Sequence, residues 1–456
     1  MNNLWLLAAL LGLPTLPMQA QGTAPAGLTT QNPARANTIQ TDSQAVLLLD
    51  DVIREALEKS PEIEGAYHAA SAMAHRVPQV KTLPDPMVGV GWAGNIAPFS
   101  VQQGDPSSYR GVTVSEQFPY PGKLKLRGQI ASKEAEAADS DLEAAQRRVT
   151  AEVKAAYYDY FSFGKAINTT NRNKELLEKL SKISEARYRV GKAMQQDVLR
   201  SQVEISLLLQ KLAMLEQQRA TAQAKLNALM QRAPESPLPP AADVEPSSLR
   251  YSLDELYALA VAHDTGMTRN GKMIEKGRLG VAAARREYKP DVGVSYMYQQ
   301  RDSMADMHGL TFSVNIPVFY KSKQRQGVLQ ASEELVNAEK EQASRLNEVR
   351  FEIKQQYLSA KASEQLLSLY TKAVVPQSSL ALESSMAAYQ VGNVDFLSLL
   401  ANFTTLWSYE TDYYRQLADY QIALASIEAL TGCDVTGPST PAPVQPEPTA
   451  PVKESN

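Results

Sequence analysis

The chain has 456 residues, and its 46 Lys and Arg nearly balance its 50 Asp and Glu. This balance excludes the strongly basic character by which nucleic-acid-binding proteins are recognised. A single cysteine, Cys433, excludes a disulfide framework, and one cysteine with four histidines offers no spacing typical of a metal cluster.

The N-terminus has the features of an export signal. Leu4–Leu13 is an apolar stretch of the length of a signal-peptide core, and Ala20 is a small residue at a cleavage position. We therefore expect a signal peptide over residues 1–20 and a disordered segment over residues 21–44. No Lys or Arg precedes the apolar stretch, which departs from the usual pattern. No cysteine lies near the cleavage position, so no lipid anchor is expected.

Beyond residue 20, the sequence contains no apolar run of about 18 residues and predicts no transmembrane helix. An exported chain of this kind is free in the periplasm, secreted, or a β-barrel.

The chain contains an internal duplication. Four blocks recur in the same order at offsets between 198 and 204 residues. The matched blocks are Leu49–Ile53 with Leu253–Tyr257, Val88–Trp92 with Val292–Tyr296, Gly111–Ser115 with Gly309–Ser313, and Tyr188–Gly191 with Tyr389–Gly392. Repeats in constant order predict two copies of one structural unit. We assign residues 45–233 to the first repeat, 234–250 to a proline-rich linker, 251–433 to the second repeat and 434–456 to a disordered proline-rich tail.

Each repeat has the same expected plan. It begins with a helix, near Asp50–Ala74 or Leu253–Arg285, and continues with two short alternating segments. A very long helix follows, over residues 121–188 or 321–389, and a return helix over 195–230 or 396–430. Small and apolar residues recur at 3- and 4-residue steps in the long segments, which is typical of coiled coils. About 65 helical residues span roughly 100 Å. Pro376 is expected to kink the second long helix.

The alternating segments predict four strands. In the second repeat, Leu310, Phe312 and Val314 alternate with Thr311 and Ser313. The segments around Val88–Trp92, Val112–Val114 and Val292–Tyr298 show the same period of two. Such segments form strands with one apolar and one polar face, as in a membrane barrel or in a hairpin that covers a soluble core.

Four strands cannot close a barrel by themselves. Membrane barrels begin at about eight strands, and an open edge in lipid leaves backbone groups unpaired. Two copies of the chain supply eight strands and three supply twelve, and a conducting pore favours three or more copies because eight-stranded barrels are filled by their own side chains. The small and polar residues Gly293, Ser295, Thr311 and Ser313 suit a water-lined interior.

These features resemble the TolC-type outer-membrane factor family over roughly residues 45–433. The resemblance rests on the duplication, on the stretch FPYPGKLKLRG at Phe118–Gly128, and on the paired Tyr-x-Val-Gly turns. It implies a mainly α fold with a small β part. Long helical hairpins then form a periplasmic α-barrel, and four strands per chain join a trimeric, 12-stranded outer-membrane β-barrel. It also implies a homotrimer that docks a periplasmic adaptor and an inner-membrane pump. Within the family, the chain looks somewhat closer to members that serve metal-cation pumps.

Two matching basic clusters follow the second and fourth strands. They consist of Lys123, Lys125 and Arg127 in the first repeat and of Lys321, Lys323 and Arg325 in the second. Cations at a helix start oppose the helix dipole, so we interpret both clusters as contacts to outer-membrane lipid phosphates. A solvated helix start is the alternative.

The two glycine turns are the predicted docking surface for the adaptor. Glycine accepts the positive φ that a reversal between long helices requires. The contact residues we expect are Tyr188, Arg189, Val190, Gly191, Tyr389, Gln390, Val391 and Gly392. Simple turn geometry accounts for the glycines equally well.

Asp197 and Asp395 lie close behind these turns and are candidates for the pore constriction, where copies from several chains form a carboxylate ring. Family members carry two aspartates beyond the second turn, where this chain has Ser398 and Ala401. A two-layer gate is therefore in doubt, and Asp395 alternatively caps a helix.

A loop between the third and fourth strands carries Met304, Met307 and His308. Thioether and imidazole ligands suit Cu(I) or Ag(I), so a weak metal site is a speculative interpretation beside that of ordinary loop residues.

The sequence predicts no catalytic residues and no cofactor, because it contains no nucleophile grouping, phosphate loop, zinc spacing or nucleotide fingerprint. A duct for metal, drug or protein export and a periplasmic coiled-coil adaptor or scaffold without a barrel remain the competing interpretations.

Overall fold

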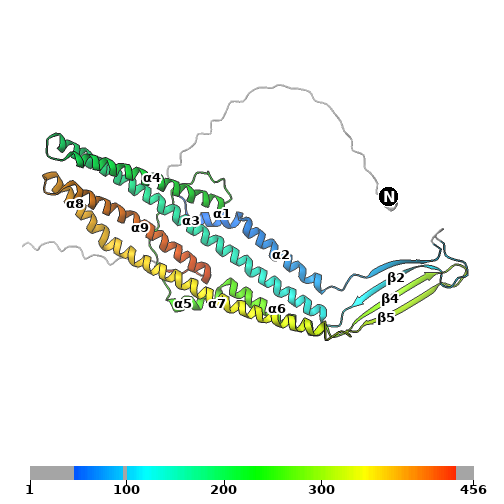
Figure 1. Cartoon of the computed structure of the whole chain (residues 1–456). Coiled ribbons are helices and arrows are strands. Elements are labelled where there is room, and N and C mark those ends of the chain that lie inside the picture. The colour runs from blue at the N-terminus through cyan, green and yellow to red at the C-terminus, as the bar shows by residue number, and fades with distance from the viewer. Residues whose placement is uncertain (1–45, 96–99, 438–456) are drawn as a thin grey trace, which may run out of the picture. The chain divides into compact units, whose positions relative to one another are not determined.

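A computed structural model describes residues 46–95 and 100–437 (Figure 1). The predicted signal peptide, the segment 21–44 and most of the predicted tail lie outside the described residues. Long helices lie side by side, and a sheet extends from the ends of α2, α3, α6 and α7.

The first repeat forms α1 (Leu49–Lys59), α2 (Pro61–Lys81), β1 (Met87–Ala93), β2 (Tyr109–Phe118), α3 (Lys123–Arg189) and α4 (Gln195–Leu229). The single helix expected near Asp50–Ala74 is two helices. Pro61 starts the second because a proline at the first helical position loses no hydrogen bond. The Ser60 side chain caps that start by accepting from the backbone N–H of Ile63 at 3.4 Å.

The second repeat forms α5 (Leu253–His263), α6 (Thr265–Arg286), β4 (Asp291–Gln300), β5 (Met307–Asn315), α7 (Gln324–Leu369), α8 (Val375–Val391) and α9 (Phe396–Thr431). The helix expected over Leu253–Arg285 also divides, at Asp264, whose side chain caps α6. A π-helical turn, η1 (Tyr370–Val374), joins α7 to α8. Pro376, which has no backbone N–H to donate, stands in the first turn of α8. The wider π-helical turn lies directly before that turn.

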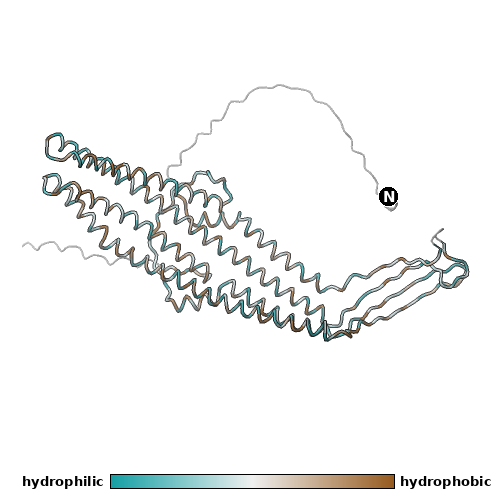
Figure 2. Tube along the Cα trace, viewed as in Figure 1, coloured by the Kyte–Doolittle hydropathy of each residue, from teal (hydrophilic) through white to brown (hydrophobic). Residues whose placement is uncertain are grey.

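Buried apolar clusters hold the described helices together, and three of them are the largest. One packs α1 against α3 and α4 around Val52, Val153 and Leu226, and a second packs α5 against α7 and α9 around Leu256 and Ile353. The third lies nearer the turns and joins all four helices of the two hairpins. Figure 2 shows apolar residues recurring along each helix, as the small and apolar spacing predicted.

Residues of the predicted linker lie against the helices. Leu47 bridges Ala241 in parallel, and Tyr157 of α3 donates to the Leu47 carbonyl at 2.9 Å and accepts from the Ala242 N–H at 3.1 Å. β3 (Ser248–Leu249) pairs with β6 (Thr436–Gly437). The expectation of a disordered tail from residue 434 is therefore wrong for residues 434–437.

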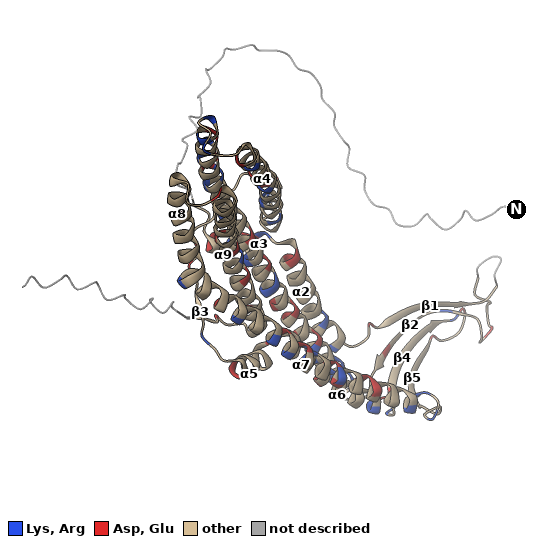
Figure 3. Ribbon diagram, turned by 60° about the vertical axis from the view of Figure 1, so that its left-hand side comes forward, with Lys and Arg blue, Asp and Glu red and all other residues tan. Residues whose placement is uncertain are grey.

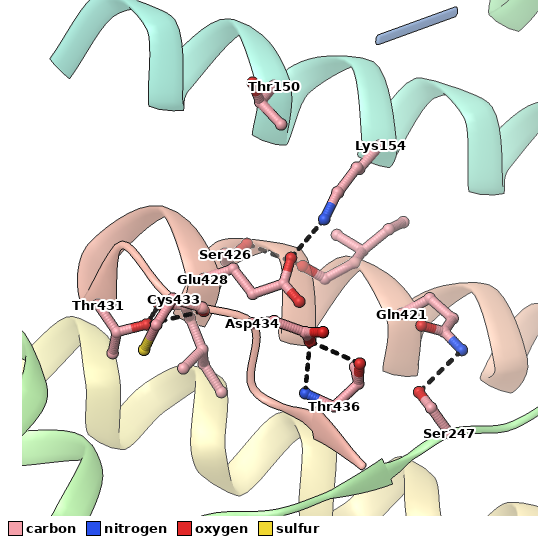
Figure 4. Close-up of polar contacts among 12 residues, drawn as sticks. Thr150, Lys154, Ser247, Gln421, Ser426, Glu428, Thr431, Cys433, Asp434 and Thr436 are labelled. Atoms are coloured by element: carbon pink, nitrogen blue, oxygen red, sulfur yellow. Dashed lines mark hydrogen bonds and ion pairs between the residues drawn. The ribbon is translucent and has the colours of Figure 1, made fainter. Parts of the chain in front are cut away.

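Figure 4 shows how polar contacts fix this end of the chain. Asp434 accepts from the backbone N–H of Thr436 at 2.8 Å, and Gln421 donates to Ser247 at 3.3 Å. Lys154 of α3 pairs with Glu428 of α9 beside them. Val435 is fully buried in the second cluster of the core, so hydrophobic burial adds to these contacts.

No helix within the described residues combines the length and the apolarity that crossing a bilayer requires.

Candidate functional site: the four-stranded sheet and the two helical turns

The sheet joins the strands of both repeats. Its order is β1-β2-β4-β5, and every neighbouring pair is antiparallel. β2 and β4 join the two hairpins, so β1 and β5 are edge strands, and no other strand among the described residues pairs with their outer edges. Exposed edges of this kind present unpaired backbone donors and acceptors.

One face of the sheet is apolar and exposed. Because alternate residues share a face, the register places the members of this set side by side. They include Val88, Val90, Val112, Val114, Val292, Tyr296, Leu310, Phe312 and Val314, all of which are exposed. Val90, at 86%, has almost its whole side chain in contact with solvent. Figure 3 shows that Lys, Arg, Asp and Glu lie mainly on the helices and sparsely on the strands.

The opposite face carries small and polar residues. Gly89, Thr113, Ser295 and Ser313 lie on it, together with the predicted inward residues Gly293 and Thr311. A Cβ on Gly111 would collide with the Tyr298 carbonyl oxygen of β4, so β2 and β4 approach there more closely than a side chain allows. The alternation predicted from the sequence is thus present in all four strands.

Lys123 is the basic residue whose surroundings differ most from expectation. Its side chain is 3% exposed, and its ammonium nitrogen lies 3.0 Å from Glu287 and 2.9 Å from Asp291. Burial by itself lowers the pKa of Lys123, but the hydrogen bonds to Asp291 and Glu287 outweigh burial and raise the pKa above its usual value. In this chain the Lys123 charge is thus neutralised by protein carboxylates. Lys125, Arg127, Lys321, Lys323 and Arg325 keep their membrane-interface role as a prediction.

Both predicted glycine turns have the same geometry. Gly191 and Gly392 adopt φ values of +74° and +86°. In each turn the glycine N–H donates to the residue three before it, and the next N–H donates to the residue five before it. This pair of bonds is the Schellman motif, which requires the left-handed conformation that glycine adopts without strain.

Arg187 connects the two turns, and the sequence analysis missed it. The guanidinium donates to the carbonyl oxygen of Gln390 at 2.7 Å and to that of Tyr389. It also lies 4.8 Å from the centre of the Tyr389 ring. Tyr188, Val190 and Val391 are exposed around it. The sequence contains no signal for this contact, because residues about 200 positions apart in the chain meet only after both hairpins have folded.

The two aspartates occupy different positions in their helices. Asp395 is exposed at the N-cap of α9, and its side chain makes no capping hydrogen bond. Asp197 lies half-buried in the first turn of α4. Asp197 lies six positions after Gly191, but Asp395 lies only three positions after Gly392. The two carboxylates are therefore not equivalent in the repeats.

The sequence analysis placed Met307 and His308 in a loop, but both belong to β5, and as consecutive strand residues they point to opposite faces of the sheet. The His308 Nδ1 lies 2.6 Å from the Tyr296 hydroxyl on the apolar face. Met304 belongs to the preceding loop. The speculative site of Met304, Met307 and His308 is therefore not assembled within one chain. Among the described residues, no group of three or more His, Cys, Asp or Glu is placed to hold a metal.

Known structures share this fold. The outer membrane protein VceC of Vibrio cholerae is 18% identical, with a TM-score of 0.71 over 84% of this chain and 96% of that one. CusC, whose crystal structures concern transmembrane channel formation, is 15% identical, with a TM-score of 0.69 over 84% and 91%. The MtrE outer membrane channel of Neisseria gonorrhoeae, in its open state, is 16% identical, with a TM-score of 0.67 over 85% and 89%. At these identities the likeness establishes the fold.

A comparison with curated proteins gives no significant match. The model of the outer membrane efflux protein family matches residues 52–231, which cover most of the first repeat, and the second repeat duplicates that unit. The predicted resemblance is thereby confirmed: the first repeat matches the outer membrane efflux protein family, and the chain shares the fold of the outer-membrane channels named above.

Proposed function

We propose that this chain is one subunit of a homotrimeric exit duct that passively conducts substrates from a periplasmic adaptor and an inner-membrane pump to the cell exterior. The observation that carries the proposal is the four-stranded sheet, which has two unpaired edges and an exposed apolar face. In lipid this face is stable, but the edges are not until they are paired. Three copies supply twelve strands, and the small and polar face then lines a water-filled interior.

The two hairpin turns are the proposed contact for the adaptor. They present exposed side chains, including Tyr188, Arg189, Val190 and Val391, on two turns of matching geometry. A surface that repeats within the chain and again around a trimer offers six similar docking positions. The duct needs no energy source of its own, because the pump supplies the free energy of transport.

We further propose that the turns separate when the duct opens, by sliding of packed helices. The contact between Arg187 and the carbonyls of Tyr389 and Gln390 favours the closed arrangement. The test introduces Arg189→Cys and Gln390→Cys together with Cys433→Ser. A short thiol-reactive crosslinker then joins the two new cysteines. Export should stop on linking and resume after the link is cleaved. Undiminished export with the link formed would exclude opening at these turns.

Asp395 is the proposed carboxylate ring at the constriction, with Asp197 as its alternative. Three exposed carboxylates around a narrow pore favour cations over anions. Asp395→Asn should lower cation selectivity in single-channel recordings of the purified trimer, and Asp197→Asn serves as the comparison. If only Asp197→Asn changes the selectivity, the constriction lies at α4 instead.

The substrate class we propose first is heavy-metal cations, on the resemblance of the sequence to channels of metal-cation systems. Multidrug efflux and type I protein secretion are the alternatives, because the pump selects the cargo. Growth of a deletion strain, with and without the restored gene, is measured on silver, copper, zinc, cobalt, nickel and a panel of lipophilic drugs. Sensitivity restricted to metals supports metal export, and broad drug sensitivity contradicts it in favour of a shared multidrug exit.

A periplasmic adaptor or scaffold without a channel is the candidate from a different class. The exposed apolar face of the sheet argues against this function, because in water such a face would be left uncovered, whereas in a membrane it contacts lipid. Cell fractionation separates the two functions. Recovery with outer membranes and a requirement for detergent support the duct, whereas recovery in the periplasmic extract contradicts it.

A further inference from the structure

The small, polar face of the sheet carries two methionines near the loop over 301–306, which joins β4 to β5 at the end of the sheet far from the helices (Figure 1). Alternation places Met297 of β4 on this face beside Ser295, and Met307 of β5 beside Gly309 and Thr311. Two long thioether side chains therefore stand on a face whose other residues are mostly glycine, serine and threonine.

The strand register makes these two methionines neighbours. Met297 pairs directly with Gly309, and Gln299 pairs directly with Met307. Met297 and Met307 are therefore diagonal neighbours on adjacent strands, with Cα atoms about 7–8 Å apart, a distance over which long side chains still reach each other. Both thioethers can thus approach a common point above the polar face.

The Met297 side chain lies across β5. A Cβ on Gly309 would stand 3.2 Å from the Met297 methyl carbon and 3.7 Å from the Met297 Cβ. The thioether end of Met297 therefore covers Gly309, which follows Met307 by two positions on the same face. A side chain at position 309 would crowd this methyl group, so glycine leaves the room that the arrangement needs.

Gln299 fixes the position of the Met297 sulfur. Its side-chain amide donates to the Met297 Sδ at 3.3 Å, and Gln299 is buried, at 5% exposure. The same residue is the direct strand partner of Met307, which is itself 40% exposed. The hydrogen bond occupies one lone pair of the Met297 sulfur, and a thioether sulfur has a second lone pair that is available to a metal.

We infer that Met297 and Met307 form a binding site for a soft monovalent cation, Cu(I) or Ag(I), on the inner face of the exit. The inference rests on the proposed duct, in which this face lines the water-filled interior. Thioether sulfur is a soft, uncharged ligand that suits these cations, whereas imidazole, which suits Zn(II) and Ni(II), is absent from the pair. Two uncharged ligands bind weakly, so a cation that enters the site can also leave it.

This pair differs from the set of Met304, Met307 and His308 that the sequence suggested. His308 is adjacent to Met307 in the chain, but alternation turns it to the apolar face. The hairpin register instead brings Met297, ten positions earlier, to the side of Met307. Sequence spacing alone does not show which residue of one strand lies beside a given residue of the next.

The experiment titrates the detergent-purified full chain with silver nitrate in chloride-free buffer. All variants carry Cys433→Ser, which removes the single thiol of the chain. Equilibrium dialysis should show one Ag(I) bound per chain, and X-ray absorption should show two sulfur ligands. Met297→Leu and Met307→Leu should each weaken Ag(I) binding by at least about tenfold. Leucine has nearly the volume of methionine, so both variants should fold.

The matched control is Met87→Leu. Met87 lies on the same polar face and is exposed, but its direct partner on β2 is Ser115, and its diagonal neighbours there are Thr113 and Gln117. A methionine without a second thioether beside it should contribute little, so this variant should bind Ag(I) as tightly as its parent. Met304→Leu, in the loop before β5, should change the affinity less than either replacement in the pair.

The outcomes separate the metal site from the duct. Undiminished binding in Met297→Leu or in Met307→Leu overturns the site, and so does an equal loss in Met87→Leu, which would mean that any exposed thioether holds silver. Loss in Met304→Leu without loss in Met297→Leu also overturns the pair. Single-channel recordings use the same preparations. A trimer that conducts ions but binds no silver leaves the proposed duct standing, whereas a preparation with neither trimers nor conductance contradicts the proposed function itself.

Discussion

Arg187, near the end of α3, donates hydrogen bonds to the carbonyl oxygens of Tyr389 and Gln390 in the last turn of α8, and its guanidinium lies 4.8 Å from the Tyr389 ring. This residue joins the tips of two hairpins that the sequence places about 200 residues apart. Hydrogen bonds from a charged donor and a cation–π contact together stabilise such a contact by roughly 2 kcal/mol.

Arg187→Ala should make the duct leaky. Losing about 2 kcal/mol from the closed arrangement raises the open population on the order of 30-fold. Cells carrying the variant should become sensitive to vancomycin, and the purified trimer should open more often in single-channel recordings. The matched control is Arg189→Ala, whose guanidinium is largely exposed and pairs with Glu185 one turn earlier. Equal sensitivity in both variants would contradict a specific role for Arg187.

Gly191→Ala and Gly392→Ala should destabilise their turns by similar amounts. Both glycines have positive φ, where a Cβ costs about 1–2 kcal/mol. At Gly392 the new Cβ makes an ordinary van der Waals contact with the Arg187 guanidinium at 3.4 Å, and at Gly191 it meets open space. Thermal unfolding of the purified protein should therefore place the Tm of both variants below that of wild type. A wild-type Tm in either variant would show that its turn does not depend on the left-handed conformation of glycine.

Tyr157→Phe should lower the free energy of unfolding by about 0.5–1.5 kcal/mol, because it removes the hydroxyl that donates to the Leu47 carbonyl and accepts from the Ala242 N–H, whereas these two backbone groups keep their own hydrogen bond at 3.0 Å. Tyr158→Phe is the matched control, since the neighbouring ring is also buried but its hydroxyl makes no hydrogen bond to the described residues. Denaturant unfolding of both variants measures the difference. Similar losses would mean that burial of the rings, and not the hydrogen bonds, holds the linker.

Glu55 makes a pH-dependent contribution to stability. The hydrogen bond from Arg232, with help from Lys59, lowers the pKa of Glu55 to about 2. A carboxyl whose pKa is lower in the folded state than in the unfolded state stabilises the fold above its unfolded pKa, and this contribution is lost as the pH falls towards the folded pKa. The Tm of Glu55→Gln should therefore lie below that of wild type at pH 6, and the difference should shrink between about pH 4.5 and 2.

The control for this measurement is Glu58→Gln, one of the neighbouring acidic positions of α1 with no ion pair among the described residues. Its Tm difference from wild type should stay nearly constant over the same pH range. A constant difference for Glu55→Gln as well would exclude the ion pair with Arg232 as the cause.

The sequence by itself determined the repeat, the order of elements within it, the alternation of the strands and the glycine turns. These follow from periods of 2 and about 3.6 residues and from the backbone freedom of glycine, all of which act over a few neighbouring residues. The tertiary structure decided the pairing of β2 with β4, the burial of Lys123 between Glu287 and Asp291, the strand at Thr436–Gly437 and the contact of Arg187 with Tyr389. Each of these joins residues more than 150 positions apart in the chain, so local periodicity carries no information about them. They form only when the two repeats pack together and the free energy of burial selects which distant groups meet.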